Sequence, residues 1–421
     1  MVSEAPSASG VETRKAALRI LDRVLRSGQT VDSASWATDK LSPEDRALAL
    51  AIVGETFRRI PELDTLIDGA TRQRLPDDSK ARMVLRLALA QKMGLGTPDH
   101  AIVATALPLI EGGPRRLVHG VLGTLLRRRL QASEAPALPE DVELRWRRAW
   151  GDEVVEAARR QIVQRAALDL SFASDESAKA FARTTGGHSL AERHVRIRSQ
   201  SVTELAGYGA GDWWVQDLAA SLPARLIPEG PDVVDLCAAP GGKTMQLAAA
   251  GHRVIALDSS KGRLKRLSEN LSRTGLSADL VEADARSWAP EGPVDSILLD
   301  APCSATGTFR RHPEVLYRVK PKFIKEAADA QLALLNRAAE WLRPGGTLVY
   351  SVCSLEPEEG EQVVQAFLAV NPDFAAREPE AGELPDLVPL TNEGWVRILP
   401  GLLADEGGLD GFFIARLVRT R

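Results

Sequence analysis

Cysteine, histidine and long apolar runs are scarce in this sequence. Three cysteines and six histidines are spread over 421 residues, and no CxxC or HExxH spacing occurs. Three cysteines cannot build a complete disulfide framework, so reduced thiols in a cytosol are expected. The missing spacings give no basis for a metal site or for a thiol–disulfide enzyme.

Membrane spans and export signals are missing as well. No apolar stretch approaches the roughly 20 residues that cross a membrane. The opening segment, MVSEAPSASGVETRK, lacks the basic and apolar regions of a secretory signal. We therefore expect a cytoplasmic protein without membrane contact, and a monomer. A length of 421 residues exceeds one compact core, so two or three domains are expected.

The charge balance is not that of a typical nucleic-acid-binding protein, because the net charge is −4. The charge is unevenly distributed, however. Residues 1–135 carry 20 Lys and Arg against 16 Asp and Glu, whereas the remainder carries 33 against 41. This split permits a basic N-terminal module that contacts an acidic partner.

Three regions follow from the hydrophobic patterns. Residues 1–135 repeat apolar side chains three and four apart, which predicts an all-α domain. Residues 136–225 begin with a Pro- and Ala-rich linker. They then predict a small α+β subdomain with one amphipathic helix over 144–162 and strands near 168–174, 194–199 and 212–217. Predicted helix starts are Ser42-Pro43-Glu44 and Asp77-Asp78, and predicted stops are Gly28, Gly94 and Gly112.

The third region, residues 226–421, alternates strand-like and helix-like segments. This alternation predicts a parallel, doubly wound, Rossmann-like α/β domain. Its last two apolar segments are expected to form an antiparallel pair at the sheet edge. The strand candidates are 232–238, 252–258, 278–284, 295–303, 346–354, 395–400 and 411–420.

Glycines and acids stand where the predicted parallel strands end. The turn 238–244, AAPGGKT, lets a ligand approach the backbone at a helix start, although a plain tight turn is the alternative. It is not a Walker loop, so a nucleoside triphosphate is disfavoured. Asp258, Asp284 and Asp300 end successive strands, and Asp258 has the spacing of an acid that binds ribose hydroxyls. Single aspartates often cap helices, but the three together favour an adenosine ligand.

All three cysteines also lie at strand ends, at Cys237, Cys303 and Cys353. A thiolate is a soft nucleophile that adds to an electron-poor carbon. Carbon 5 of cytosine is inert to methylation until a nucleophile adds at carbon 6, and a second thiol would suit the later release. A buried, purely apolar role is the alternative for either Cys303 or Cys353 alone. The pair favours S-adenosylmethionine over a hydride carrier as the adenosine ligand.

The segments LCAAPGGKT, LDAPCSATGTFRRHPE and YSVCSLEPEEGE resemble the signature segments of the RNA 5-methylcytosine methyltransferases, the RsmB/NSUN superfamily. The helical module resembles the NusB-like RNA-binding domain of the RsmB (Sun) branch, whose substrate is small-subunit (16S) ribosomal RNA. DWWVQDLAASLPARLI resembles the segment that precedes the first motif. The resemblance spans nearly the whole chain and is closest over residues 233–361.

The resemblance implies a role for individual residues. Cys353 is the expected nucleophile, and Cys303 is expected to assist product release. Asp300 is also expected to border the cytosine. Glu314 and Tyr317 depart from the aspartate and tryptophan of many relatives, which bears on RNA contacts. The implied contacts to S-adenosylmethionine are Cys237, Ala238, Ala239, Pro240, Gly241, Gly242, Lys243, Asp258, Asp284 and Asp300.

An enzyme that acts on a base in structured RNA must take that base out of the stack, and cationic contacts help to offset the cost. Arg310 and Arg311 are the predicted RNA contacts because they follow Cys303 closely. Other basic clusters are Arg115-Arg116, Arg127-Arg128-Arg129, Arg145 and Arg147-Arg148. The alternative functions are a non-catalytic RNA-binding or ribosome assembly factor, and the same chemistry on transfer RNA or DNA.

Overall fold

The computed structural model describes residues 8–197, 202–230 and 232–421, which divide into two compact units. The helical unit contains the described residues up to Gln164 together with Phe309–Val319. The sheet unit contains Arg165–Thr308 and Lys320–Arg421. The three-part division at residues 135 and 225 stays a prediction. Residues 1–7 of the predicted helical domain and residues 198–199 of a predicted strand lie outside the described residues.

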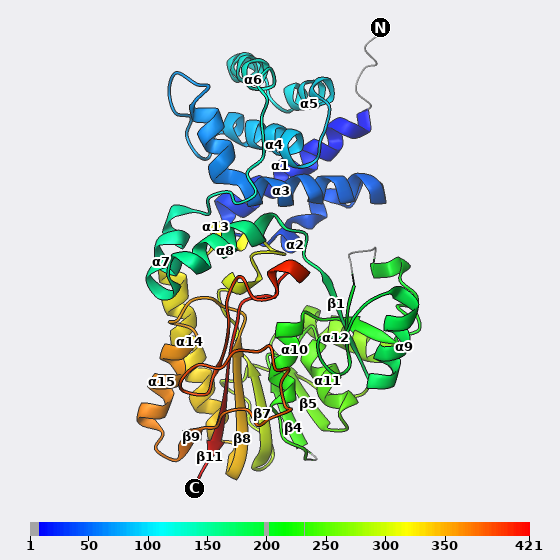
Figure 1. Ribbon diagram of the computed structural model, residues 1–421, viewed down its shortest axis with the longest axis vertical. Helices are drawn as coiled ribbons and strands as arrows, with labels where there is room; N and C mark the ends of the chain where they lie inside the picture. Colours follow the sequence, from blue (N-terminus) through cyan, green and yellow to red (C-terminus); the bar gives the residue numbers. More distant parts are fainter. Residues whose placement is uncertain (1–7, 198–201, 231) are drawn as a thin grey trace. The chain divides into compact units, whose positions relative to one another are not determined.

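The helical unit consists of α-helices joined by short turns, as its sequence pattern predicts (Figure 1). Its elements are α1 (Ala8–Ser27), α2 (Val31–Ala34), η1 (Ser35–Thr38), α3 (Pro43–Asp68), α4 (Lys80–Gly94), α5 (Asp99–Ala106), η2 (Leu107–Leu109), α6 (Gly112–Leu125), α7 (Glu140–Trp150), α8 (Asp152–Val163) and α13 (Val315–Arg318).

Several helix boundaries test the sequence signals directly. Ser42 caps α3 by accepting a hydrogen bond from the backbone N–H of Asp45, as predicted. Gly28 follows α1 with a φ of +64°, also as predicted. Two predictions were wrong. The cap of α4 is Ser79 rather than Asp77-Asp78, and Gly112 begins α6 instead of ending α5.

The predicted single helix over 144–162 is in fact two helices. Gly151 has a φ of +86° and separates α7 from α8. A left-handed backbone conformation cannot continue a right-handed helix, and glycine adopts it without steric cost. The amphipathic pattern continues across the break, which explains why periodicity alone missed it.

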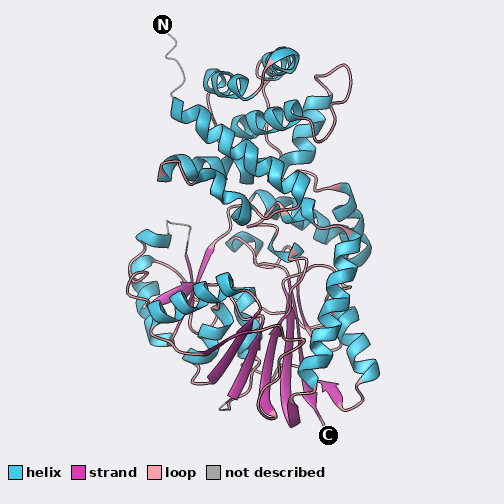
Figure 2. Ribbon diagram, turned by 180° about the vertical axis from the view of Figure 1, so that it is seen from behind, coloured by secondary structure: helices cyan, strands magenta, loops and turns pink. Residues whose placement is uncertain are grey.

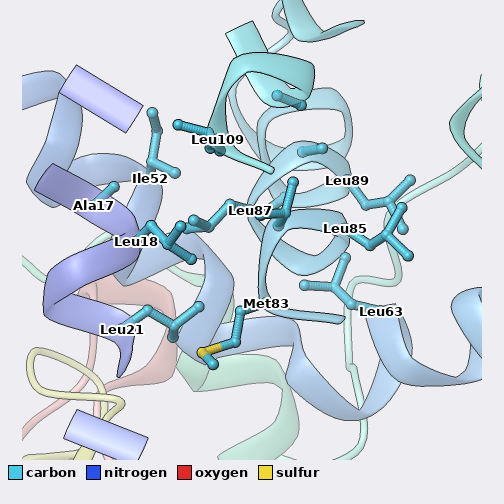
Figure 3. Packing of buried hydrophobic residues seen from close by; sticks show 14 of the residues in the cluster. Ala17, Leu18, Leu21, Ile52, Leu63, Met83, Leu85, Leu87, Leu89 and Leu109 are labelled. Atoms are coloured by element: carbon cyan, nitrogen blue, oxygen red, sulfur yellow. The ribbon is translucent and has the colours of Figure 1, made fainter. Parts of the chain in front are cut away.

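The core of the helical unit gathers leucine, isoleucine and alanine side chains from α1, α3, α4 and η2 (Figure 3). Helix α4 is buried on every side from Ala81 to Gln91. Its two buried arginines, Arg82 and Arg86, contact Asp64 of α3 at 3.0 and 2.7 Å. The pairing with Asp64 compensates the burial of both charges, since a buried charge is tolerated only when it is paired.

The segment Phe309–Val319 packs within the helical unit although it lies between two stretches of the sheet unit. The Phe309 ring lies 5.4 Å from the ring of Trp146 on α7. The Tyr317 hydroxyl donates a hydrogen bond of 2.8 Å to the carbonyl oxygen of Phe57 on α3. The chain therefore crosses between the units shortly after Cys303.

The sheet unit begins with the predicted small α+β subdomain. An antiparallel sheet in the order β2-β1-β3 joins β1 (Leu168–Phe172), β2 (His194–Ile197) and β3 (Trp213–Val215), and α9 (Asp175–Thr185) accompanies it. Asp169 of β1 accepts two hydrogen bonds of 2.7 Å from Arg196, and one of 3.0 Å from the backbone N–H of Leu218. The last bond ties the subdomain to the helix that precedes the main sheet.

The main sheet has the order β10-β11-β8-β7-β4-β5-β6, and β9 pairs with β11. Strands β4 to β8 are parallel, and β11 runs antiparallel to β8. Strand β10 pairs antiparallel with β11, so the predicted antiparallel pair at the edge is confirmed. Figure 2 shows these strands side by side. Its strands are β4 (Asp232–Leu236), β5 (Arg253–Asp258), β6 (Asp279–Glu282), β7 (Val294–Asp300), β8 (Leu342–Val352), β9 (Phe374–Ala376), β10 (Val396–Ile398) and β11 (Phe412–Arg419).

Helices cover both faces of the main sheet (Figure 1). Val233 packs with one apolar cluster, whereas Val234 packs with the cluster on the other face, because successive side chains of a strand alternate. Helices α10 to α12 contribute to the first cluster, and α14 and α15 to the second. The helices are α10 (Leu218–Arg225), α11 (Gly242–Ala249), α12 (Lys261–Thr274), α14 (Pro321–Ala339) and α15 (Glu361–Val370), with short turns η3 (Val202–Glu204), η4 (Thr306–Thr308) and η5 (Ala404–Glu406).

The strand order reverses between β4 and β7. The chain runs from β4 to β5 and β6 on one side, and then returns to place β7 on the other side of β4. Ligands of open α/β sheets bind at the carboxyl ends of the strands beside such a switch point. The topology therefore places the candidate site at the ends of β4, β5, β7 and β8.

Candidate active site

The glycine-rich turn joins the end of β4 to the start of α11. Gly241 has a φ of +107°, and a Cβ atom there would lie 2.1 Å from Cδ1 of Leu267. Only glycine fits this position without displacing the leucine. The N-terminus of α11 follows at Gly242, so its free backbone N–H groups lie at the carboxyl edge of the sheet.

Asp258 ends β5 and is only 2% exposed. Its carboxylate accepts hydrogen bonds from the backbone N–H groups of Ala239, at 3.2 Å, and Ser260, at 2.9 Å. The first bond ties the acid to the glycine turn. Arg263, whose side chain is half exposed, also contacts the carboxylate at 3.2 Å. Asp258 thus holds the turn and presents its negative charge beside it.

Asp284 follows the end of β6 and is partly exposed. The guanidinium of Arg286 bonds to its carboxylate, with one contact of 3.0 Å. This hydrogen bond lowers the pKa of Asp284 to about 2. The group is therefore a charged acceptor throughout the neutral pH range, at the strand end where the sequence predicts the adenine side of a ligand.

Lys243 and Asp300 form an ion pair between the turn and the end of β7. Nζ of Lys243 lies 2.7 Å from Oδ2 of Asp300 and 5.2 Å from the centre of the Phe412 ring. The other carboxylate oxygen of Asp300 accepts a hydrogen bond of 2.9 Å from the Ser351 hydroxyl. Ser351 lies two residues before Cys353. The contacts of Asp300 with Lys243 and Ser351 therefore join the glycine turn to the loop that contains Cys353.

Cys303 and Cys353 lie together at the ends of two adjacent strands. Strands β7 and β8 are parallel, and Asp300 pairs with Ser351 in their register. Cys303 and Cys353 follow Asp300 and Ser351 by three and two residues, and their Sγ atoms lie 3.5 Å apart. Both thiols are free and half-buried. The parallel register therefore unites two cysteines that are 50 residues apart in the chain.

The two thiols are not equivalent. The hydrogen bond with Cys353, together with burial, raises the pKa of Cys303 well above its ordinary value. Cys303 consequently keeps its proton, and either sulfur can be the donor of the hydrogen bond between them. An S–H that is donated to a neighbouring sulfur stabilises negative charge there.

The third cysteine, Cys237, lies at the end of β4. Burial, followed by the nearby carboxylates of Asp300 and Asp258, raises the pKa of Cys237 to about 12. A thiol that remains protonated is a poor nucleophile. Cys237 also has a φ of +61° and begins the glycine turn. Its place in the site is structural, beside the predicted ligand.

A buried acid beside both cysteine loops was missed by the sequence reasoning. Glu359 is fully buried, and its carboxylate accepts hydrogen bonds from Ser304 and Ser354, the residues that follow the two cysteines. The available signal was the run EPEEGE directly after Cys353, because so many acids beside an apolar strand require a special environment. Which of these acids is buried could not be read from the spacing.

The predicted RNA contacts Arg310 and Arg311 do not lie in the same unit as the cysteines, because both belong to Phe309–Val319. The side chain of Arg310 is 1% exposed, whereas Arg311 is exposed. Burial leaves the Arg310 guanidinium without access to RNA in this conformation. Its carbonyl oxygen instead accepts a hydrogen bond from Arg58 of α3. Only Arg311 of the two is accessible to an RNA contact.

The other basic clusters also differ in their surroundings. Arg145 and Arg147 form ion pairs with Asp141 and Asp152 at 3.3 and 2.5 Å. In contrast, the arginines on and after α6 are exposed, and none forms an ion pair with a described carboxylate; they are Arg115, Arg116, Arg127, Arg128 and Arg129. Exposed, unpaired cations are the ones available to a polyanion.

The hydrogen-bonding groups at the sheet edge fit S-adenosylmethionine. Carboxylates at the ends of β5 and β6, Asp258 and Asp284, can accept hydrogen bonds from ribose hydroxyls and an adenine amino group. The N-terminal backbone N–H groups of α11, which follow Gly241, are further hydrogen-bond donors at this edge. Within residues 8–197, 202–230 and 232–421, no cluster of three metal-ligating side chains occurs. No helix of the described chain is long and apolar enough to cross a membrane.

The fold and the site define a nucleotide-binding α/β enzyme with a paired-thiol centre, and comparison with known proteins makes this assignment specific. Residues 225–418 match the family described as 16S rRNA methyltransferase RsmB/F. Residues 11–127 match the NusB family. The two matches cover the sheet-forming region and the helical region, respectively.

A full-length relative shows the family of the whole chain. Ribosomal RNA small subunit methyltransferase B of Klebsiella pneumoniae (strain 342) is 32% identical over 441 residues, which cover 98% of this chain and 99% of the relative. The chain therefore belongs to the RsmB/F family of methyltransferases. The predicted family, the methyltransferase activity and S-adenosylmethionine as its methyl donor are confirmed.

Two solved structures share the fold. The crystal structure of PH0851 has a TM-score of 0.74 with 24% identity, and covers 98% of this chain and 100% of its own. NSun6 from Pyrococcus horikoshii, solved with SFG, has a TM-score of 0.59 with 20% identity, and covers 68% of this chain and 99% of its own. The predicted combination of a NusB-like all-α domain, a small α+β subdomain and a Rossmann-like methyltransferase sheet is confirmed.

Proposed function

We propose that this enzyme methylates carbon 5 of a cytosine in small-subunit (16S) ribosomal RNA through a covalent adduct with Cys353. The single observation that carries the proposal is the 3.5 Å separation of the Cys303 and Cys353 sulfurs beside the glycine turn. Two thiols at this distance are useful for a reaction that needs one nucleophile and a second group to assist its departure.

The chemistry begins with Cys353. Its thiolate adds to carbon 6 of the cytosine, which breaks the 5,6 double bond and makes carbon 5 nucleophilic. Bound S-adenosylmethionine supplies the methyl group on a cationic sulfur. Asp300 and Lys243, paired at 2.7 Å between the turn and the cysteine loops, flank the base and orient its polar edge. Holding the base and the methyl donor in line lowers the entropic part of the barrier.

Release of the product requires the thiol to leave again. After the methyl group is on carbon 5, water takes the proton of that carbon, the electron pair of the C–H bond restores the 5,6 double bond, and the bond between carbon 6 and Cys353 breaks with its electron pair left on sulfur. Cys303, whose raised pKa keeps its thiol protonated, directs its S–H to the departing sulfur as a hydrogen bond and keeps the proton. The thiolate of Cys353 is then regenerated with its negative charge stabilised.

The cofactor contacts that the sequence predicts are the second part of the proposal. Asp258 and Asp284 hold the ribose and adenine side, and the turn from Cys237 to Lys243 faces the remainder of the cofactor. The contacts proposed individually in this turn are Cys237, Ala238, Ala239, Pro240, Gly241, Gly242 and Lys243. Arg263 contacts the Asp258 carboxylate, so ribose binding displaces a half-exposed arginine.

The substrate assignment rests on the relatives and on exposed charge. The relative from Klebsiella pneumoniae is named for the small ribosomal subunit, and the match to the NusB family supports an RNA-binding module. Arg311 and the exposed arginines of α6 supply cations for the phosphate backbone. We further propose that the enzyme is a cytoplasmic monomer. Size-exclusion chromatography with light scattering tests the oligomeric state.

The proposal is tested with purified full-length protein, methyl-labelled S-adenosylmethionine and transcribed 16S ribosomal RNA. We expect label in 5-methylcytidine after nuclease digestion, and none with Cys353→Ala. RNA that contains 5-fluorocytosine cannot lose a proton from carbon 5. It should therefore trap the adduct, and peptide mapping should locate the RNA fragment on Cys353.

Three outcomes of this experiment test the nucleophile, the substrate and the catalytic activity separately. Full activity of Cys353→Ala would exclude Cys353 as the nucleophile. Label on transfer RNA but not on ribosomal RNA would overturn the substrate assignment. No label on any RNA, with RNA binding intact, would favour the alternative of a non-catalytic assembly factor.

A further inference from the structure

The two cysteine loops meet around one buried carboxylate. Oε1 of Glu359 accepts a hydrogen bond of 2.7 Å from the backbone N–H of Ser304 and one of 3.1 Å from Nε2 of Gln331. Oε2 accepts hydrogen bonds from the hydroxyls of Ser304 and Ser354. Four donors from three chain segments therefore converge on a side chain that is 0% exposed.

The two serines are the immediate neighbours of the two cysteines. Ser304 follows Cys303 in the loop after β7, and Ser354 follows Cys353 in the loop after β8. The strand ladder between β7 and β8 ends at Asp300 and Ser351. Two further backbone bonds join the segments, from the N–H of Ala301 to the carbonyl oxygen of Ser351 at 2.9 Å and from the N–H of Gly307 to that of Cys353 at 3.0 Å. The remaining contacts between the two loops are made by side chains, and these place Ser304 next to Ser354.

Other contacts hold Glu359 itself in place. The hydroxyl of Tyr350, on β8, donates a hydrogen bond of 2.6 Å to the carbonyl oxygen of Glu359. Gln331 of α14 donates to the carbonyl oxygen of Pro302 at 2.9 Å as well as to Glu359. The acid is therefore anchored to a strand and a helix, and rigid anchors make a positioning group precise.

The chemistry of the side chain matches this arrangement. A carboxylate is the one side chain that only accepts hydrogen bonds and has two oxygens to do so. All four partners donate, so a carboxylate satisfies each of them. Glutamine has nearly the same shape but carries an NH₂ group in place of one oxygen, so the donors on that side lose their acceptor. Burial raises the pKa of Glu359 and opposes the charge, which explains why so many donors surround it.

We propose that Glu359 is a positioning residue that sets the distance between the Cys303 and Cys353 thiols by binding Ser304 and Ser354. The inference rests on the proposed function for its catalytic meaning. Its geometric content, the thiol separation, can be measured without any substrate. Glu359 does not touch the reacting atoms, so it acts through the two loops.

Disulfide trapping measures the geometry directly. Diamide, an azo compound, takes two electrons and two protons from the thiol pair, which leaves a Cys303–Cys353 disulfide and a hydrazine. Because the sulfurs are 3.5 Å apart, the wild type should form this disulfide rapidly. We expect Glu359→Ala to form it about tenfold more slowly and Glu359→Gln to lie between. Non-reducing peptide mapping separates this disulfide from any that involves Cys237.

Glu358→Gln is the matched control, since Glu358 is the exposed neighbour of Glu359 in the same loop. It should oxidise at the wild-type rate. In methylation assays, Glu359→Gln should lower kcat by about a hundredfold, because misplacement of reacting groups by about 1 Å has effects of that size. The KM for S-adenosylmethionine should stay within about twofold of the wild type.

A variant could oxidise or methylate slowly only because it is partly unfolded. We therefore compare the rates of disulfide formation and of methylation well below the melting temperature of each variant, where the remaining difference reflects the separation of the thiols. If Glu359→Ala does not fold, Glu359→Gln and Ser354→Ala carry the same test. Wild-type disulfide rates in the folded variants would overturn the assignment of Glu359. A wild type that forms the disulfide but methylates no RNA would instead refute the proposed function and keep the geometric role.

Discussion

The carboxyl edge of the main sheet has two sides, and each of them places cysteine at a strand end in a different chemical environment. The cofactor side comprises the ends of β4, β5 and β6, with Cys237, Asp258 and Asp284. The cysteine side comprises the ends of β7 and β8, with Cys303 and Cys353. Each side places a thiol at a strand end, yet the pKa of Cys237 is raised to about 12 by burial and carboxylates, whereas Cys353 has a thiol partner at 3.5 Å.

The difference shows that position at a strand end does not decide reactivity. On the cofactor side, burial and then the surrounding carboxylates oppose ionisation of the Cys237 thiol. On the cysteine side, the two thiols share a hydrogen bond, and the carboxylate of Glu359 accepts from four donors. The environment of each thiol, rather than its place in the topology, separates the proposed binding residue, Cys237, from the proposed nucleophile, Cys353.

The sharpest way to break this comparison is Cys303→Ala. If Cys303 assists the departure of Cys353, its removal should lower kcat by about a hundredfold, the size expected when a hydrogen-bond donor to developing negative charge is lost. The RNA–protein adduct should persist and appear as a slow band in denaturing gels. An inactive variant without an adduct would instead place Cys303 in the attack step.

Asp284→Asn tests the cofactor side. Loss of a charged acceptor should raise the KM for S-adenosylmethionine about tenfold, the lower end expected for a charged hydrogen bond, with a smaller change in kcat. Since the pKa of Asp284 is about 2, the wild-type KM should not titrate with this group between pH 5 and pH 8. Asp279→Asn, at the opposite end of β6, is the control and should leave KM unchanged.

Asp235 of β4 allows a test of how the stability of the main sheet depends on pH. It is fully buried in β4, where Thr244 donates a hydrogen bond of 2.6 Å to Oδ2, while Oδ1 has no hydrogen-bond partner among the described residues. Burial raises its pKa to about 7. The folded protein therefore binds this proton more tightly than the unfolded chain, whose Asp titrates near pH 3.9.

The sign of the effect follows from that difference. The stabilisation from protonated Asp235 is complete below about pH 4 and is lost as the pH rises through about 7. Asp235→Asn removes the titration, so the melting temperature of the variant relative to the wild type should rise by about 3 °C from pH 5 to pH 8. Asp232→Asn, at the partly exposed start of β4, is the control. Parallel pH profiles of Asp235→Asn and the wild type would contradict the raised pKa.

Cys237→Ala should have the smallest effect. Because its thiol stays protonated and makes no attack, we expect kcat to remain within about twofold of the wild type. A larger loss of kcat with an unchanged KM for S-adenosylmethionine would give Cys237 a chemical role and erase the contrast between the two sides.

Much of the fold could be predicted because its signals are local. The 3.6-residue pattern of the helical region and the alternation after residue 226 follow from side chains that neighbour one another in the chain. The errors were local too. Gly151 interrupts an amphipathic pattern without altering it, and the cap of α4 moved from Asp77-Asp78 to Ser79 because either kind of residue can cap a helix.

The residues of the candidate site could be predicted one by one from the sequence. Strand ends carry the three acids and the three cysteines, and the signature segments identify their class. Arg310 shows the limit of this reasoning, since two adjacent arginines look alike in sequence, yet Arg310 is 1% exposed and Arg311 is exposed. Burial depends on what packs against a residue, and the sequence near Arg310 does not encode that.

By itself, the sequence determined the element types, the chemistry available at the strand ends and the family, because each depends on residue identity and short spacing. Tertiary structure alone decided that the sulfurs of Cys303 and Cys353 lie 3.5 Å apart, that Glu359 binds the neighbours of both, and that Phe309–Val319 belongs to the helical unit. Those features join residues that are distant along the chain. They exist only when the parallel register of β7 and β8 and the packing of buried polar groups have been established.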